Sequence, residues 1–71
     1  GAYAVHASGN VLVVAGLGSQ ADVTVATLAG QNIASLTTRA GSATITLPGK
    51  GIYIVKIVEN GSAKAVKVVN R

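Results

Sequence analysis

The sequence predicts an all-β protein, specifically an immunoglobulin-like Greek-key β-sandwich of about seven short antiparallel strands. Val, Ile and Thr are abundant, and glycines interrupt the chain at intervals of roughly ten residues, a spacing of short strands and turns that is typical of sandwiches and barrels. No window repeats apolar residues at spacings of three and four over two turns, so no helix is expected. The alanine-rich stretch 26–36 comes nearest to such a pattern, and Gly30 within it argues against a helix.

The expected strands follow the alternation of apolar and polar residues along the chain. Val23 and Val25 should face the core with Asp22 and Thr24 on the other side, because successive side chains of a strand point to opposite faces. The segment Val11–Ala15 is apolar at nearly every position, which is expected if both of its faces are covered or if it lies near an edge. The strands expected before the terminal hairpin are Tyr3–Ala7, Val11–Ala15, Asp22–Thr27, Ile33–Thr37 and Ala43–Leu47.

Turn residues fill the segments between these strands. Gly30 is expected at a position of positive φ in the turn 28–31. The segment Gly16–Gln20 is expected to be a flexible loop. Pro48 should end the fifth strand, because proline cannot donate a hydrogen bond to a ladder.

The chain is organised around its terminal hairpin, residues 51–71, which carries four of the six basic residues. Asn60-Gly61 predicts a two-residue type I′ turn, since both central residues of that turn need positive φ. Lys56 and Lys67 then lie diagonally across the strands on one face. Two interpretations of these lysines stay open, namely solubility with edge protection or a basic strip that a partner binds. The turn also fixes the register of the hairpin, and its core face is expected to consist of Tyr53, Val55, Val66 and Val68.

The length and composition indicate one domain, residues 1–71. The chain has no cysteine, so it has neither disulfides nor a thiolate metal site. Charged residues make up 11% of the chain with a net charge of +4, and only Tyr3 and Tyr53 are aromatic. Nucleic-acid binders usually combine clustered Lys and Arg with stacking aromatics, so no nucleic-acid partner is expected.

The start of the sequence shows no secretory signal. If the protein is exported, its signal is therefore expected on a parent chain. Gly1-Ala2 fits either a native start or the end of a cut linker. The longest apolar run, Val11–Ala15, is far shorter than the roughly 18 residues that suggest a membrane span.

The sequence is poor in residues that do chemistry, with one His, one Asp and one Glu. Only Asp22 could orient His6 as a general base, and no nucleophile pattern surrounds any serine, so His6 is expected to be a strand residue facing solvent. A metal site needs three or four closely spaced ligands, and His6, Asp22 and Glu59 are too scattered to supply them. The sequence therefore predicts no enzyme activity, no metal and no cofactor in this chain.

The terminal hairpin resembles the signature of the type IX secretion system C-terminal sorting domain, the gingipain-type carboxy-terminal signal. That family ends with a Gly-Xaa-Tyr strand, a short Gly-bearing turn and a final Lys-Val-Val-type strand with a terminal Lys or Arg. The matching segments here are Gly51–Lys56, Asn60-Gly61 and Lys67–Arg71. Upstream, Val23–Gln31 resembles the family's Val-Xaa-Val-Tyr-Asp-Leu-Xaa-Gly-Arg block. The motif positions are Gly51, Tyr53, Gly30 and Gly61.

The resemblance covers roughly residues 10–71, in the same order and spacing of blocks, and the chain ends where members of the family end. Four positions depart from the pattern. Ala26 stands where an aromatic is common, Thr27 where Asp or Asn is common, and Gln31 where Arg is common. Asn70 interrupts the final run of valines.

The resemblance implies a secretion signal rather than a catalyst. Residues 1–71 would be the immunoglobulin-like C-terminal sorting domain of a larger secreted parent, which can itself be an enzyme such as a protease. The implied partners are the type IX translocon, outer-membrane shuttle proteins and a sortase-type protease that cleaves near the N-terminal side and can anchor the cargo. The domain would be in the periplasm in transit and then at the cell surface or secreted. The implied recognition residues are Lys67, Val68, Val69, Asn70 and Arg71.

Two other interpretations compete with a sorting domain. One is an immunoglobulin-like accessory module that binds carbohydrate or mediates adhesion. Sugar binding usually needs exposed aromatic rings, and only Tyr3 is expected to be free for that. The other is a structural spacer or an engineered sandwich. The exposed edge strands are also compatible with a homodimer that pairs through them.

Overall fold

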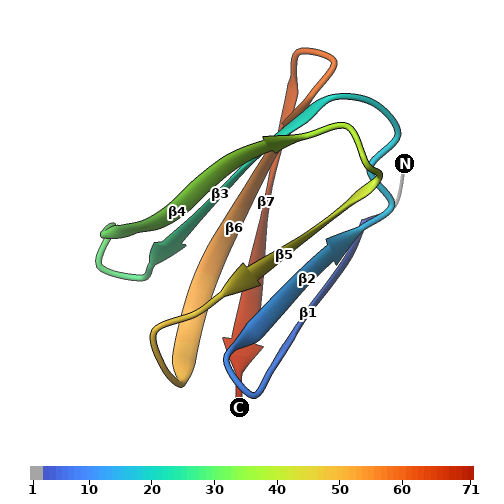
Figure 1. Ribbon diagram of the computed structural model, residues 1–71. Coiled ribbons are helices and arrows are strands. Elements are labelled where there is room, and N and C mark those ends of the chain that lie inside the picture. The colour runs from blue at the N-terminus through green and yellow to red at the C-terminus, as the bar shows by residue number, and fades with distance from the viewer. Residues whose placement is uncertain (1–2) are drawn as a thin grey trace.

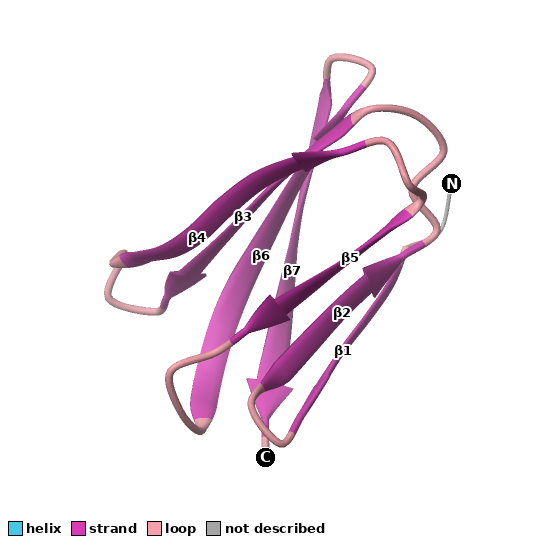
Figure 2. Ribbon diagram, in the orientation of Figure 1, coloured by secondary structure: helices cyan, strands magenta, loops and turns pink. Residues whose placement is uncertain are grey.

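The computed structural model describes residues 3–71, so the question of the origin of Gly1-Ala2 lies outside the described residues. Seven antiparallel strands form the described chain, as predicted, and no helix occurs within it (Figure 2). Each strand lies within one or two residues of its expected bounds. The strands are β1 (Ala4–Ser8), β2 (Val11–Ala15), β3 (Ala21–Thr27), β4 (Asn32–Thr38), β5 (Ser42–Thr46), β6 (Gly51–Glu59) and β7 (Ser62–Asn70).

The strands form two sheets that face each other (Figure 1). One sheet has three strands in the order β1-β2-β5, and the other has four in the order β4-β3-β6-β7. The chain changes sheet between β2 and β3, between β4 and β5, and between β5 and β6. The pairs β2 with β5 and β3 with β6 therefore join strands that are not consecutive in the sequence, which is the immunoglobulin-like Greek-key arrangement.

The core lies between the two sheets and is built from the inward-facing residue of each alternating pair. Val23 and Val25 are fully buried while Asp22 is exposed, which confirms the alternation predicted for this strand. Ala43, Ile45 and Leu47 are buried in the same way, with the threonines between them exposed. Tyr3, Val5, Ile33, Ala34 and Leu36 are partly buried around this centre, and the largest side chains fully buried in it are Leu12, Ile57, Val14, Val23, Val25, Val55 and Asn70.

One strand differs from its expected surroundings. The apolar strand β2 was expected either to have both faces covered or to lie near an edge. It lies in the middle of the three-stranded sheet, and its outer face is partly exposed. Leu12 and Val14 are buried in the core, whereas Val11 is 42% exposed on the outer face. The outer valines contribute β-propensity rather than burial, since β-branched side chains favour the extended backbone.

The turns agree with the predicted chemistry. Asn60 and Gly61 have φ of 53° and 76°, and the register that follows from them pairs Glu59 with Ser62. A second turn of the same kind, Gly9-Asn10 with φ of 58° and 67°, joins β1 to β2. Gly30 has φ of 92°, as expected.

The loop expected to be flexible is instead attached at two points. Leu17 is 6% exposed and belongs to the core, and its backbone N–H donates to the carbonyl of Gly41 at 3.0 Å. The backbone N–H groups of Gly18 and Ser19 both bind the Glu59 carboxylate. The glycines let the loop turn sharply while its single leucine fills the space between the sheets.

Candidate functional site

The final strand, β7, presents two different sets of side chains. It pairs only with β6 and is an edge strand of the four-stranded sheet. Of the five residues expected to be read by a partner, Val68 and Asn70 are buried, with 8% and 2% of their surface exposed. Lys67, Val69 and Arg71 are exposed. In the folded domain, a partner that binds side chains of this segment can therefore reach only these last three.

Asn70 holds the end of β7 to two other parts of the chain. Its Nδ2 donates to Oδ1 of Asn10 at 2.8 Å and to the carbonyl of Gly49 at 2.7 Å. Its Oδ1 accepts from the backbone N–H of Asn10 at 3.1 Å. Next to it, the N–H of Gly9 donates to the carbonyl of Arg71 at 3.2 Å. The buried amide that interrupts the valine run is thus hydrogen-bonded to the β1–β2 turn and to the loop before β6, and a buried amide without such partners would be costly.

Two motif residues support the same corner of the sandwich. The Tyr53 hydroxyl donates to the Gly49 carbonyl at 2.8 Å, while its ring is buried. Gly51 begins β6 with φ of 140°, a conformation that side-chain-bearing residues rarely adopt. The other two motif glycines, Gly30 and Gly61, lie in turns at positive φ. The four motif positions shape the strand ends and turns.

The outer face of the β6–β7 hairpin has the register that the sequence predicts. Ile54 pairs with Lys67 and Ile52 with Val69, and Lys56 pairs with Ala65 one step away. Lys56 and Lys67 are both exposed on this face. Asp22 and Glu59, the only Asp and Glu of the sequence, lie at the end of these strands nearest the β6–β7 turn, where Asp22 pairs with Val58, two residues from Lys56. Lys67, opposite Ile54, lies toward the other end of the face.

Glu59 connects the hairpin turn to the start of the chain. Its Oε1 accepts from the Tyr3 hydroxyl at 2.8 Å, and its Oε2 accepts from the N–H groups of Gly18 at 2.6 Å and Ser19 at 2.8 Å. The Ser19 N–H, followed by the Tyr3 hydroxyl, lowers the pKa of the Glu59 carboxyl because each bond favours its charged form. Conversely, the bond to Glu59 raises the pKa of Tyr3, since the phenol must keep its proton to donate.

Tyr3 is not the free aromatic ring that the carbohydrate-binding interpretation requires. Its hydroxyl binds Glu59, its ring packs against the core, and the Nζ of Lys64 lies 5.9 Å from the ring centroid. Tyr53, the other aromatic residue, is buried. Neither aromatic ring of the chain therefore offers an open face for a sugar to stack on.

The three acid–base residues considered for chemistry do not converge. His6 is exposed on β1, on the outer face of the three-stranded sheet, as expected. Asp22 lies on the outer face of the opposite sheet, where its Oδ1 accepts from the Thr37 hydroxyl at 2.6 Å. Glu59 is occupied with the loop and Tyr3. Within residues 3–71 no three potential metal ligands lie close together, and no pocket is found.

Comparison of the chain with protein-family models, curated proteins and solved structures finds no match in any of the three. Residues 3–71 contain no helix that is long and apolar enough to cross a bilayer.

Sequence reasoning missed two structural roles at this site. The sequence assigns Asn70 to the recognition segment and treats it as a departure from the motif, although a lone amide in an apolar run at a strand end is a signal for a buried hydrogen-bonding residue. Glu59 was considered only as a candidate for chemistry. No local pattern could have revealed its partners, because Tyr3 and Ser19 lie 56 and 40 residues away.

Proposed function

We propose that this domain is a C-terminal sorting domain of the type IX kind, which directs a larger parent protein through an outer-membrane translocon. The resemblance of the hairpin and of Val23–Gln31 to that family supports the proposal, together with the immunoglobulin-like sandwich that the resemblance implied. After export, a sortase-type protease would remove the domain and could anchor the cargo at the cell surface.

The observation that supports the proposal most strongly is that buried and exposed side chains alternate at the end of β7. Val68 and Asn70 fix the strand in the interior, which leaves Lys67, Val69 and Arg71 exposed on a rigid support. A partner can then read a defined arrangement of charge and apolar surface without having to order a flexible tail, and preorganisation of this kind lowers the entropic cost of binding.

The test is export of a reporter fused ahead of this domain in a bacterium that has a type IX system. Deleting residues 67–71 would also remove the buried Asn70, so a deletion mixes loss of folding with loss of recognition. The sharper variant is Lys67→Gln with Arg71→Gln, which keeps the buried residues. We expect the wild-type fusion to reach the surface and the double variant to accumulate in the periplasm, measured by the accessibility of the reporter to external protease.

The matched control is Arg39→Gln with Lys64→Gln, which removes the same charge elsewhere on the domain. It should be exported as well as wild type. The proposal fails if the wild-type fusion stays in the periplasm, or if a strain without the translocon exports it equally well.

A further inference from the structure

Three of the four large apolar side chains that are exposed in residues 3–71 gather at one end of the four-stranded sheet. Leu28 is 63% exposed, Ile52 37% and Val69 41%. Ile52 and Val69 are direct cross-strand partners. Leu28 follows Thr27, whose partner is Tyr53, so it leaves β3 beside the strand position of Ile52. The fourth, Val11, lies on the other sheet.

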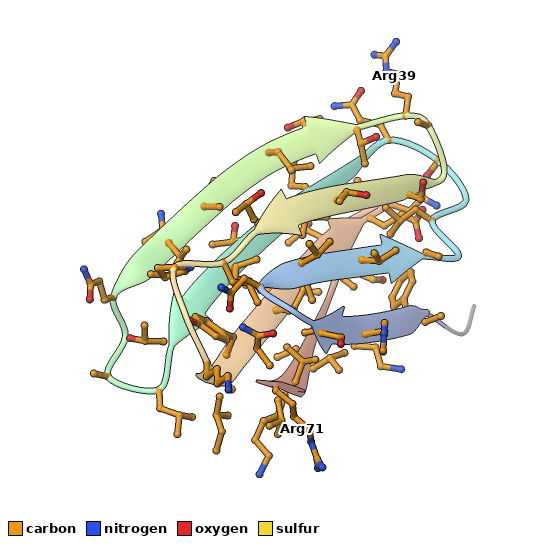
Figure 3. The ribbon with its side chains drawn as sticks, turned by 60° about the horizontal axis from the view of Figure 1, so that its bottom comes forward. Arg39 and Arg71 are labelled. Carbon is orange, nitrogen blue, oxygen red and sulfur yellow. The ribbon has the colours of Figure 1, made fainter. Side chains whose placement is uncertain are left out.

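The same end carries positively charged side chains and no Asp or Glu. Lys50 and Arg71 leave the strands just beyond the paired residues Gly51 and Asn70, and Lys67 lies one row inward, opposite Ile54. Figure 3 shows Arg71 extending away from the sandwich, far from Arg39 at the other end. Asp22 and Glu59, the only Asp and Glu of the sequence, both lie at that far end, where Asp22 pairs with Val58. We name this surface the basic end, defined as Leu28, Lys50, Ile52, Lys67, Val69 and Arg71.

We propose that the basic end is a docking surface for a protein partner that presents carboxylates around an apolar centre. This inference rests on the proposed sorting function, in which the partner is a component of the export machinery, and it adds Leu28, Lys50 and Ile52 to the recognition surface. The positive charge of the basic end favours a partner with an acidic surface. Such charge complementarity speeds association and fixes the orientation of the two proteins. Exposed aliphatic side chains rimmed by polar groups mark interaction sites.

Charge argues against a second copy of this chain as the occupant. Two basic ends packed together would bring lysines and arginines against one another with no Asp or Glu among the six residues, and like charges across an interface oppose binding. A lipid surface is also less suitable. Residues at membrane interfaces are typically Trp and Tyr, whereas this end is aliphatic and both tyrosines of the chain are engaged elsewhere.

The apolar part of the proposal is tested with Leu28→Ser and Ile52→Thr in the reporter fusion. We expect each to reduce the export rate about tenfold at low expression, since burial of a large aliphatic side chain contributes at least that factor to an affinity. The control is Val11→Thr, which changes an aliphatic residue on the other sheet whose exposure, 42%, lies between those of Ile52 and Leu28, and it should be exported at the wild-type rate. Circular dichroism melts of each purified variant confirm that the domain is folded.

The charged part is tested by comparing reversal with neutralisation. An acidic partner requires Lys50→Glu and Lys67→Glu to reduce export more than Lys50→Gln and Lys67→Gln, by about fivefold or more per site. Arg39→Glu, at the other end, should have no effect. Equal export of the Glu and Gln variants would remove the acidic partner from the proposal and overturn it.

Two further measurements test the two alternative occupants of the basic end, a lipid surface and a second copy of the chain. The purified chain is sedimented with phosphatidylglycerol and with phosphatidylcholine vesicles, and its mass is measured by analytical ultracentrifugation. A monomer that binds neither vesicle supports a protein partner. Binding to the anionic vesicles, or a dimer, that is lost in Leu28→Ser overturns the proposal in favour of a lipid or a second copy.

The two proposals fail in different ways. A wild-type fusion that stays in the periplasm overturns the sorting function and the docking surface with it. A wild-type fusion that is exported while Leu28→Ser and Ile52→Thr are exported equally fast overturns the docking surface alone.

Discussion

The two ends of the sandwich hold their chain segments together by different chemistry. At the end with the β6–β7 turn, the ionised Glu59 gathers Tyr3, Gly18 and Ser19. At the basic end, the neutral amide of Asn70 performs the equivalent task. The hydrogen bonds made by charged side chains in residues 3–71 all lie at the first end, and they also include Asp22 with Thr37 and Arg39 with Gln20.

The difference shows how a chain with few charges can distribute them. At the Glu59 end, charge is used within the fold. At the basic end, a neutral amide closes the structure, and this leaves Lys67 and Arg71 available to another molecule. Because the Glu59 carboxyl titrates and the Asn70 amide does not, the hydrogen bonds of Glu59 should depend on pH and those of the Asn70 side chain should not.

Replacing Asn70 should have the largest effect on stability. Asn70→Ala removes three hydrogen bonds and leaves the side chain of Asn10 without this partner, so we expect it to cost about 3 kcal/mol in the free energy of unfolding, measured by urea denaturation. The control Asn32→Ala removes an exposed amide whose one side-chain hydrogen bond within residues 3–71 is to the Ser35 hydroxyl, and it should stay within about 0.5 kcal/mol of wild type. Similar values for the two variants would show that Asn70 does not hold the basic end.

Gly51→Ala should have the next largest effect. Nothing lies within 4 Å of an added Cβ, so the cost comes from the backbone at φ of 140°, and we expect about 2 kcal/mol. Gly49 is two residues away, also has open space around it, and has no positive φ. Gly49→Ala should therefore be neutral or slightly stabilising. The expectation is contradicted if both variants melt at the wild-type temperature.

Acid should weaken the hydrogen bonds that hold the Glu59 end together and leave those of the Asn70 side chain unaffected. The pKa of Glu59 is lowered on folding, so its contribution is present above the ordinary value of 4.5 and is lost as pH falls through the lower folded value. Unfolding measured from pH 7 to pH 2 should show this loss in wild type and much less of it in Glu59→Gln. An unchanged acid dependence in Glu59→Gln would contradict the assignment.

Tyr3 provides the alkaline counterpart of that experiment. Its pKa is raised above the ordinary 10.0, so its contribution is present below that value and is lost as pH rises through the folded value. Tyr3→Phe should therefore be less stable than wild type at neutral pH, and the difference should shrink above pH 10. A constant difference would mean that ring packing, and not the hydroxyl, carries the contribution of Tyr3.

Neutralising the basic end should have the smallest effect. Lys67 is exposed and has no hydrogen-bonded partner among residues 3–71, so Lys67→Gln should change the free energy of unfolding by less than about 0.5 kcal/mol. Arg39→Gln, which loses its bonds to Gln20, is the comparison at the other end. A large loss of stability in Lys67→Gln would place this lysine in the architecture rather than in recognition.

The sequence predicted much of this fold because its signals are local. Asn60-Gly61 sets the register of the final hairpin, and that register holds through all the pairs from Glu59 with Ser62 to Gly51 with Asn70. The inward positions of β3 and β5 follow from a period of two, which any half-buried strand must obey. These features depend on residues that are close in the chain, so alternation and turn chemistry are enough to find them.

The candidate site was predicted less completely. The final five residues were singled out together, and the structure separates them into two buried and three exposed side chains. The predicted hairpin register already pairs Ile52 with Val69, but Leu28 was not connected with them, because Leu28 and Val69 are 41 positions apart in the sequence. The pairing of β3 with β6 and of β6 with β7 brings them to one end of the sheet.

By itself, then, the sequence determined the class of fold, the strand positions and the hairpin register, since these follow from the backbone preferences of single residues and their near neighbours. Only the tertiary structure decided that Glu59 binds Tyr3 and Ser19, that Asn70 is buried and hydrogen-bonded to distant segments, and that Leu28 joins Ile52 and Val69 at the basic end. Those relationships arise when the strands cross between sheets and bring distant segments together. Polar groups that meet there must find partners or remain in water, and no periodicity along the chain records which of the two occurs.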